Sequence, residues 1–295
     1  MVQTISLTML ALLAFAGNSV LCRIALDNNV IDAASFTSIR LFSGIVFLLF
    51  LVVTKSKQKI SFKKGSWLSA SFLFLYALAF SYGYITLDTG TGALILFGAV
   101  QTTMIIFSLI KGRKLLFIEW VGLLFAALGL CILLLPGASA PSLNGFILMA
   151  ISGAAWGAYT LAGKSSQNPL VDTAHNFLKT LPLIAIVTLL TLGDIQLSNK
   201  GIILAIASGA VMSGLGYAIW YSVLTKLSVT QAATIQLSVP IIATIGGVIF
   251  SNELVTIKLT LASMLVLGGI LVVTLGKQYI ENRYKKGTCN KCRSS

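Results

Sequence analysis

Long apolar stretches of about twenty residues each follow one another along nearly the whole chain, separated by short polar connections. A hydrocarbon core about 30 Å thick is crossed by a helix of roughly 20 apolar residues. The pattern predicts an all-α integral membrane protein whose connections are too short to form a catalytic domain. The ten predicted spans lie near residues 4–26, 33–54, 67–86, 91–110, 117–136, 144–163, 172–192, 201–224, 230–250 and 257–275.

The ten transmembrane helices fall into two groups of five, and a shift of 140 residues brings the second group into register with the first, so that Gly17 aligns with Gly157. Because each half has an odd number of spans, the second half enters the membrane from the opposite side. This predicts two inverted five-helix repeats, a design that usually holds a substrate between the halves near the membrane midplane. The expected divisions are a first repeat over 1–137, a second over 138–276 and a basic cytoplasmic tail over 277–295.

Composition and charge placement support a membrane location and give an orientation. Hydrophobic residues make up 57% of the chain and charged residues 10%, which leaves too little polar surface to cover a soluble globule. The formal net charge is +13, with basic residues concentrated between spans 2 and 3, between spans 4 and 5, and after span 10. Cytoplasmic loops collect Lys and Arg, so both termini are expected in the cytoplasm of a prokaryote, at its inner or plasma membrane. This topology signal explains the charge better than binding of nucleic acid does.

Short motifs follow one another along the second half: Ala155-Trp156-Gly157 in span 6, Pro240 in span 9, and Asn252-Glu253 followed by Gly268-Gly269 in span 10. By the order and spacing of these motifs, the chain resembles the EamA-type transporters of the drug/metabolite transporter superfamily over all ten spans. The resemblance implies a secondary transporter, often an exporter of amino acids or other small metabolites, with spans 3, 4, 8 and 9 lining a central cavity.

The first half departs from the family pattern at three places. Ala16-Gly17 stands where the family often has Trp-Gly, Val100 replaces a proline, and Arg113 takes the place of a glutamate. These departures leave the resemblance to the superfamily intact, but they do not allow the chain to be assigned to a subfamily.

Charged side chains at bilayer depth are costly unless they face a cavity or a partner, which makes them functional candidates. Arg40 lies about two turns into span 2, too deep to reach the headgroups easily. Arg23, near the outer end of span 1, is expected to extend to the headgroups instead. Arg40 and Lys179 are nearly one repeat apart, so an inverted repeat places one cation near each mouth of a path. We expect both to attract substrate charge and to act as gates.

Span 7 carries a polar stripe on one helical face, since its members follow one another at spacings of three and four residues. One interpretation is a cationic wall of the substrate path; the other is a cytoplasmic helix end from which Lys179 stretches outward. His175 is the single histidine, and a near-neutral pKa would suit it to proton coupling, although a structural histidine is the simpler interpretation. The stripe consists of Asp172, His175, Asn176 and Lys179.

Amide and aromatic side chains complete the predicted site. An amide in the middle of a membrane needs a hydrogen-bond partner, so Gln101 and Gln236 are expected to orient the solute, with tyrosines packing against it. Prolines free a backbone carbonyl and permit a kink, which suggests hinges at Pro182 and Pro240. The candidate substrate-binding residues are Arg40, Tyr82, Gln101, Trp156, Tyr159, His175, Lys179, Tyr217, Tyr221 and Gln236.

The acidic residues limit the substrate class, because all eight lie at span ends, in connections or in the tail. We therefore expect alternating access for a small zwitterionic or anionic metabolite, with an amino acid and export as the leading assignment. The alternatives are a multidrug or organic-cation exporter of the same fold and, in another class, an integral-membrane lipid-modifying enzyme. A cation exporter would need a carboxylate deep in a span, and a lipid-modifying enzyme would need a cluster of catalytic groups. The spans show neither. A non-enzymatic transporter remains the prediction.

No cofactor, metal ion or nucleic acid is expected as a partner. The pair Cys289 and Cys292 stands alone in the tail, whereas a structural zinc site takes four ligands. The segment from Gly157 to Ser165 has the wrong glycine spacing and the wrong setting for a phosphate-binding loop. The expected partners are a small-molecule substrate and the lipid bilayer. The oligomeric state is not predicted, and a monomer is compatible with the sequence.

Overall fold

The structure is a computed structural model that describes residues 2–27, 30–56, 64–112, 115–135, 140–164, 166–224, 226–227 and 234–291, with side chains from 3 to 274. Within these ranges it consists of helices and contains no strand, as the all-α prediction requires. Arg113 and Cys292 lie outside the described residues. A single backbone bridge joins Ile31 to Leu197, between the connections that precede α2 and α9.

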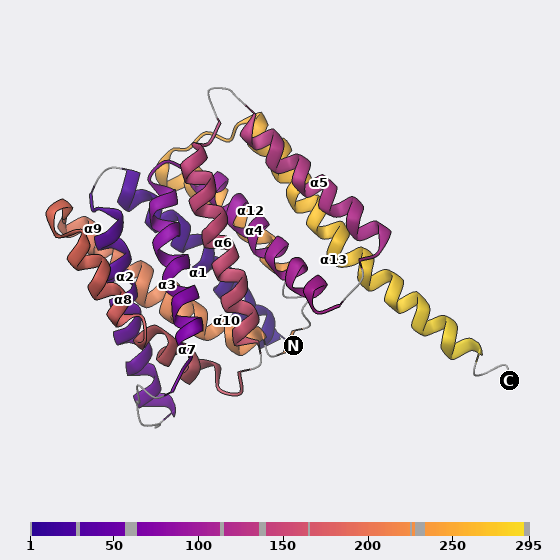
Figure 1. Cartoon of the computed structure of the whole chain (residues 1–295), viewed down its shortest axis with the longest axis horizontal. Helices are drawn as coiled ribbons and strands as arrows, with labels where there is room; N and C mark the ends of the chain where they lie inside the picture. Colours follow the sequence, from indigo (N-terminus) through magenta and orange to yellow (C-terminus); the bar gives the residue numbers. More distant parts are fainter. Residues whose placement is uncertain are drawn as a thin grey trace.

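Helices occupy all ten predicted spans (Figure 1). They are α1 (Val2–Asp27), α2 (Ala33–Leu51) continued by the π-helical η1 (Val52–Ser56), α3 (Trp67–Tyr84), α4 (Thr89–Ile110), α5 (Phe117–Leu134), α6 (Leu143–Gly163), α7 (Pro169–Leu178), α8 (Leu181–Leu190), the 3₁₀ turn η2 (Leu192–Asp194), α9 (Asn199–Ile206), the π-helical η3 (Ala207–Leu215), α10 (Gly216–Leu224), α12 (Ser238–Ser251) and α13 (Ile257–Lys291).

Nine of the described helical segments are long and apolar enough to cross a membrane. The predicted span outside this set is α3, whose sequence is interrupted by serines, tyrosines and a tryptophan. These residues lower its mean hydropathy, and several of them are buried against the rest of the bundle. The polar side chains of α3 are therefore partly buried inside the bundle, where one of its tyrosines contributes to the candidate site.

Two spans are broken rather than kinked by proline. Span 7 consists of α7 and α8, and Pro182 lies in the first turn of α8. Pro240 lies likewise in the first turn of α12. A proline is tolerated there because the N–H groups of a helix's first turn have no partner within the helix, so the absence of an N–H breaks no hydrogen bond. The two predicted hinges therefore mark the starts of helices rather than the centres of continuous ones.

Helices of the two halves pack against each other. Helix α1 packs against η3, α10 and α12, whereas α6 packs against α3 and α4. Helix α5 runs along α13 at one side of the bundle (Figure 1), where a Cβ on Gly122 would meet the carbonyl of Gly269. The first helix of each half thus packs against helices of the other half, as expected if the two halves are related by a two-fold axis. The inverted sense of the repeats stays a prediction.

The last helix is longer than its predicted span. Span 10 was expected to end near residue 275, but α13 continues to Lys291 (Figure 1). The basic tail therefore extends the transmembrane helix out of the bundle.

Candidate functional site

The guanidinium of Arg40 is held in the middle of the bundle by hydroxyl groups from three other segments. Its Nε donates to Ser213 Oγ of η3 at 3.2 Å. Its Nη2 donates to Tyr76 Oη of α3 at 3.0 Å and to Tyr217 Oη of α10 at 3.3 Å. The residue is 1% exposed. The four segments α2, α3, η3 and α10 thus meet at one buried cation.

Aromatic rings enclose this cation. Its Cζ lies 5.3 Å from the ring centroid of Tyr76 and 4.9 Å from that of Phe80, within the range of a cation–π contact. The Trp156 ring of α6 lies 5.0 Å from Tyr76 and 4.7 Å from Tyr217, and Phe15 of α1 lies 5.7 Å from Trp156. The centre of the bundle is therefore an aromatic cluster built by both halves.

The charge of Arg40 is not neutralised by the described part of the chain. Among the described residues, no carboxylate lies within 4.0 Å of its guanidinium, and all its hydrogen-bond partners are neutral hydroxyls. Its Nη1 is buried and has no hydrogen-bond acceptor within the described part of the chain. Buried charges are normally paired, so this cation is suited to binding an acceptor that the chain does not supply.

A small cavity of about 10 Å³, which is room for about one water molecule, lies next to Tyr76, Phe80 and Tyr217, the residues that contact the cation. The site is therefore closed to a metabolite in this conformation. Over the described residues, no three His, Cys, Asp or Glu side chains gather as metal ligands. The cavity is lined by Phe15, Ser19, Tyr76, Phe80, Leu96, Phe97, Trp156 and Tyr217.

Small residues and a π-helical segment bring η3 to α2. A Cβ on Gly209 would overlap the carbonyl of Arg40, so only glycine permits this approach. Beyond this contact, η3 places Ser208 and Ser213 toward the centre, where Ser208 donates to Asn18 Oδ1. Asn18 in turn donates to Tyr76 Oη at 3.3 Å. The polar groups around the cation form one network across α1, α2, α3 and η3.

The polar stripe of α7 contacts the start of α3 at the predicted cytoplasmic end. Lys179 Nζ donates to the Gly65 carbonyl at 2.9 Å and lies 5.0 Å from the Trp67 ring centroid. Asn176 Oδ1 accepts a hydrogen bond from the Ser66 N–H at 3.0 Å. We call these contacts of Lys179 and Asn176 with residues 65–67 the inner latch. Lys179 is 4% exposed, so the structure favours neither of the two simple interpretations: the cation points to a loop carbonyl.

His175 and Asp172 lie beside the inner latch. His175 is 1% exposed, and its Nδ1 lies 2.7 Å from the Val171 carbonyl. Asp172 accepts a hydrogen bond from Ser166 at 2.5 Å. A polar pocket of about 500 Å³ opens between this face of α7, the start of α3 and the end of α6. It forms a vestibule at the end of the bundle that is predicted to face the cytoplasm.

Charges gather at the opposite end of the bundle. Arg23 lies 2.8 Å from Asp27 and 3.5 Å from both Asp88 and Glu253. Glu253 accepts hydrogen bonds from Thr89, from its N–H at 2.9 Å and from its hydroxyl at 2.8 Å. We call this cluster the outer clamp, since it joins α1 to the start of α4 and to the connection between α12 and α13. Arg23 was expected to extend to the headgroups; it is ion-paired and 12% exposed instead.

The other predicted residues are distributed unevenly around the centre. Tyr159 and Tyr221 are buried with their ring centroids 5.8 Å apart, on the vestibule side of Trp156. Gln101 and Gln236 are both buried. Tyr82 is 36% exposed, so the structure does not bring it to the aromatic cluster.

Two important residues were missed as site candidates. Tyr76 accepts hydrogen bonds from the Arg40 guanidinium and from Asn18, but it is not among the residues predicted from the sequence. Its spacing from Phe80 was the available signal. Glu253 was noted only as part of a motif. Asn252 before it takes a left-handed φ of 53°, which asparagine tolerates, and so turns Glu253 toward α4.

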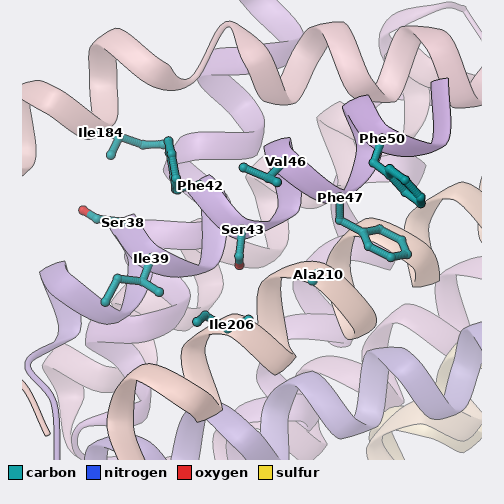
Figure 2. A pocket seen from close by; sticks show the side chains of 10 residues that line it. All are labelled: Ser38, Ile39, Phe42, Ser43, Val46, Phe47, Phe50, Ile184, Ile206 and Ala210. Carbon is teal, nitrogen blue, oxygen red and sulfur yellow. The ribbon is translucent and has the colours of Figure 1, made fainter. Parts of the chain in front are cut away.

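A larger groove lies away from this chemistry. It has a volume of about 680 Å³ and lies between α2, α8 and the α9–η3 segment. Figure 2 shows apolar side chains such as Phe42, Val46 and Ile184 around it, with hydroxyls only at Ser38 and Ser43. A groove of this composition on a membrane helix face suits lipid chains and offers no charge to orient a polar metabolite.

Comparisons with known proteins agree with this architecture. The model of the EamA-like transporter family matches residues 143–275. The chain is 48% identical over 271 residues to an uncharacterised protein of Pseudomonas aeruginosa, covering 92% of this chain and 94% of that protein. It is 26% identical over 206 residues to an uncharacterised transporter of Archaeoglobus fulgidus, covering 68% and 72%. One crystal structure shares the fold with a TM-score of 0.66 at 17% identity, covering 92% of this chain and 96% of that one.

Proposed function

Because residues 143–275 match the EamA-like transporter family and a relative is named a transporter, we propose that the chain is a secondary transporter that moves a small zwitterionic or anionic metabolite by alternating access. An amino acid is the leading candidate, and export is the proposed direction. The multi-pass protein would lie in the inner or plasma membrane of a prokaryote with both termini in the cytoplasm, as the placement of its basic residues indicates.

The observation that carries this proposal is the unneutralised cation at the centre. Removing an arginine from water costs several kcal/mol even after relaxation, and hydroxyls and ring faces offset only part of that cost. A carboxylate or phosphate ligand would supply the missing charge and the missing acceptor for Nη1 of Arg40. A cation exporter needs the opposite arrangement, a carboxylate near the centre, and none lies within 4.0 Å of this guanidinium in the described part of the chain.

The two ends of the bundle support alternating access. The outer clamp joins Arg23 to Glu253, and the inner latch joins Lys179 to the Gly65 carbonyl. With both in place, the central cavity has no room for a metabolite. Alternate breaking of the clamp and the latch would open the site first to one side and then to the other.

Transport assays with Arg40 variants test this function. Purified protein in proteoliposomes loaded with unlabelled amino acids should exchange them for labelled ones outside. Since hydrogen bonds to a charged group contribute about 1.5–3 kcal/mol, Arg40→Gln should reduce exchange by roughly ten- to a hundredfold. Arg40→Lys keeps the charge without the planar fork and should retain an intermediate rate.

The matched control is Tyr82→Phe, which removes a hydroxyl from a half-exposed tyrosine of α3 and should leave exchange unchanged. Exchange that survives Arg40→Gln would contradict the role of the cation. Transport of lipophilic cations in place of anions or zwitterions would contradict the substrate class. Efflux from loaded cells that is no faster than in cells lacking the protein would contradict export.

A further inference from the structure

The central site supplies hydrogen-bond donors and positive charge, and the lining of its cavity supplies no anionic partner for an ammonium group. Arg40 Nη1 carries N–H groups without an acceptor among the described residues. The cavity next to Tyr76, Phe80 and Tyr217, which contact the guanidinium, is lined by aromatic and aliphatic side chains and one serine. The polar groups of this lining are neutral hydroxyls, with no carboxylate or side-chain amide among them, so a ligand's negative group gains a charged partner and a positive group gains none.

The ring faces next to the guanidinium do not compensate for this absence. An aromatic face attracts a cation, but the faces of Tyr76 and Phe80 already lie against the guanidinium at 5.3 and 4.9 Å. An ammonium group near them would lie close to a like charge in a medium of low dielectric constant, where repulsion is strong. Farther from the guanidinium, the rings of Phe15 and Trp156 and the hydroxyl of Ser19 offer neutral contacts only, so the amino group of an α-amino acid would lose its water without gaining a charged partner.

We propose that the site recognises the carboxylate of its substrate and does not recognise an amino group, so that the favoured ligands are organic acids with an uncharged apolar body. The inference rests on the proposed function and narrows its substrate class from zwitterionic or anionic to anionic. The acid group binds Nη1 of Arg40, and the body of the ligand lies among Phe15, Trp156 and Leu96. A 2-hydroxy acid binds better than the amino acid with the same side chain.

Matched ligands separate these contributions. The probes are alanine, leucine and phenylalanine, the corresponding 2-hydroxy acids, and the amines that result from decarboxylation of the three amino acids. Each set has one body and differs in which charged group it carries. The measurement is the shift in thermal unfolding temperature of the purified full-length protein with ligand concentration, which yields a dissociation constant.

The expected order is 2-hydroxy acid, then amino acid, then amine, with about a tenfold difference in dissociation constant between the first two for the best body, equivalent to 1.4 kcal/mol. Arg40→Gln should remove the response to the acids. If this variant does not fold, Ser213→Ala serves instead: it removes one contact to Nε and should weaken all the acids alike without changing their order.

The outcomes are distinct for the two proposals. If amino acids bind and the 2-hydroxy acids do not, this inference is wrong and the proposed function stands. If the amines bind best, or none of the nine compounds shifts the unfolding temperature, the proposed substrate class itself fails. Equal binding of acid and amino acid also overturns the inference, because the ammonium group would then have found a partner.

Discussion

Two arginines of neighbouring helices, Arg23 of α1 and Arg40 of α2, have opposite environments. Arg23 lies at the end of the bundle that is predicted to face outward, within 3.5 Å of Asp27, Asp88 and Glu253. Arg40 lies in the middle and is almost fully buried, and its guanidinium contacts hydroxyls and aromatic rings. Within the described part of the chain, the more deeply buried charge is the one without a counter-charge.

This difference in environment suggests different roles for the two arginines. An arginine neutralised by carboxylates joins the segments that carry them, and its ligand is the protein itself. An arginine with an open donor in a closed aromatic cluster can bind a group that the described part of the chain does not supply. The comparison therefore predicts a clamp role for Arg23 and a binding role for Arg40, and substitutions beside each residue test it.

The largest effect is expected from Ser213→Asp, which gives Arg40 a carboxylate partner at the 3.2 Å position of the serine oxygen. The new carboxylate would neutralise the cation and compete with the substrate. Transport should fall by about a hundredfold, whereas the protein should fold, because the buried charge is now paired. Exchange in proteoliposomes and thermal unfolding are the two measurements.

Ser213→Asn is the control, since it has nearly the same shape as aspartate without the charge. It should reduce transport much less than Ser213→Asp does. Equal losses in the two variants would mean that shape, rather than charge, disables the site, and the comparison of the two arginines would lose its meaning.

The second effect concerns Glu253→Gln, which removes a negative charge from the outer clamp. The glutamate holds the start of α4 through Thr89 and faces Arg23, so the free energy of unfolding should fall by about 1–3 kcal/mol. The outer side should also open more often. Labelling by an impermeant maleimide of a cysteine placed at Ser19, in a background with the four native cysteines replaced, should become faster.

Asp27→Asn is the matched control for the clamp. Asp27 pairs with Arg23 one helical turn away, and its side chain is 44% exposed. Exposed pairs at this spacing contribute about 0.3–0.5 kcal/mol. If Asp27→Asn destabilised the protein as much as Glu253→Gln, the clamp would be a local feature of α1 rather than a connection between helices.

The sequence predicted the spans well because membrane helices need long apolar runs, and these are visible without any tertiary information. It also predicted that Arg40 lies deep in a span, and the residue is buried in the structure, while its role in substrate binding stays a prediction. It could not find the partners. Tyr76 and Ser213 are 137 positions apart, and only the packing of α3 and η3 brings both to the guanidinium.

Lys179 likewise has a contact partner that the sequence alone could not predict. Depth and helical spacing left open whether Lys179 faces the substrate path or stretches outward, and the carbonyl that it contacts belongs to Gly65, in the connection before α3. Gly65 has a φ of 82°, a conformation that glycine adopts freely. A loop conformation of this kind cannot be read from the hydropathy of the spans, so the inner latch emerged only from the structure.

The smallest effect on transport is expected from a comparison of two tyrosines of α3, one beside the Arg40 guanidinium and one away from it. Tyr76→Phe removes the hydroxyl that accepts hydrogen bonds from Arg40 and Asn18, while Tyr82→Phe removes a half-exposed one. A hydrogen bond to a neutral group contributes about 0.5–1.5 kcal/mol, and one to a charged group somewhat more. We therefore expect exchange to be reduced about five- to tenfold by Tyr76→Phe and unchanged by Tyr82→Phe. Because phenylalanine keeps the ring beside the guanidinium, a loss as large as that of Arg40→Gln would show that Tyr76 itself contacts the substrate. No loss at all would show that the cation is positioned by Ser213 and Tyr217 alone.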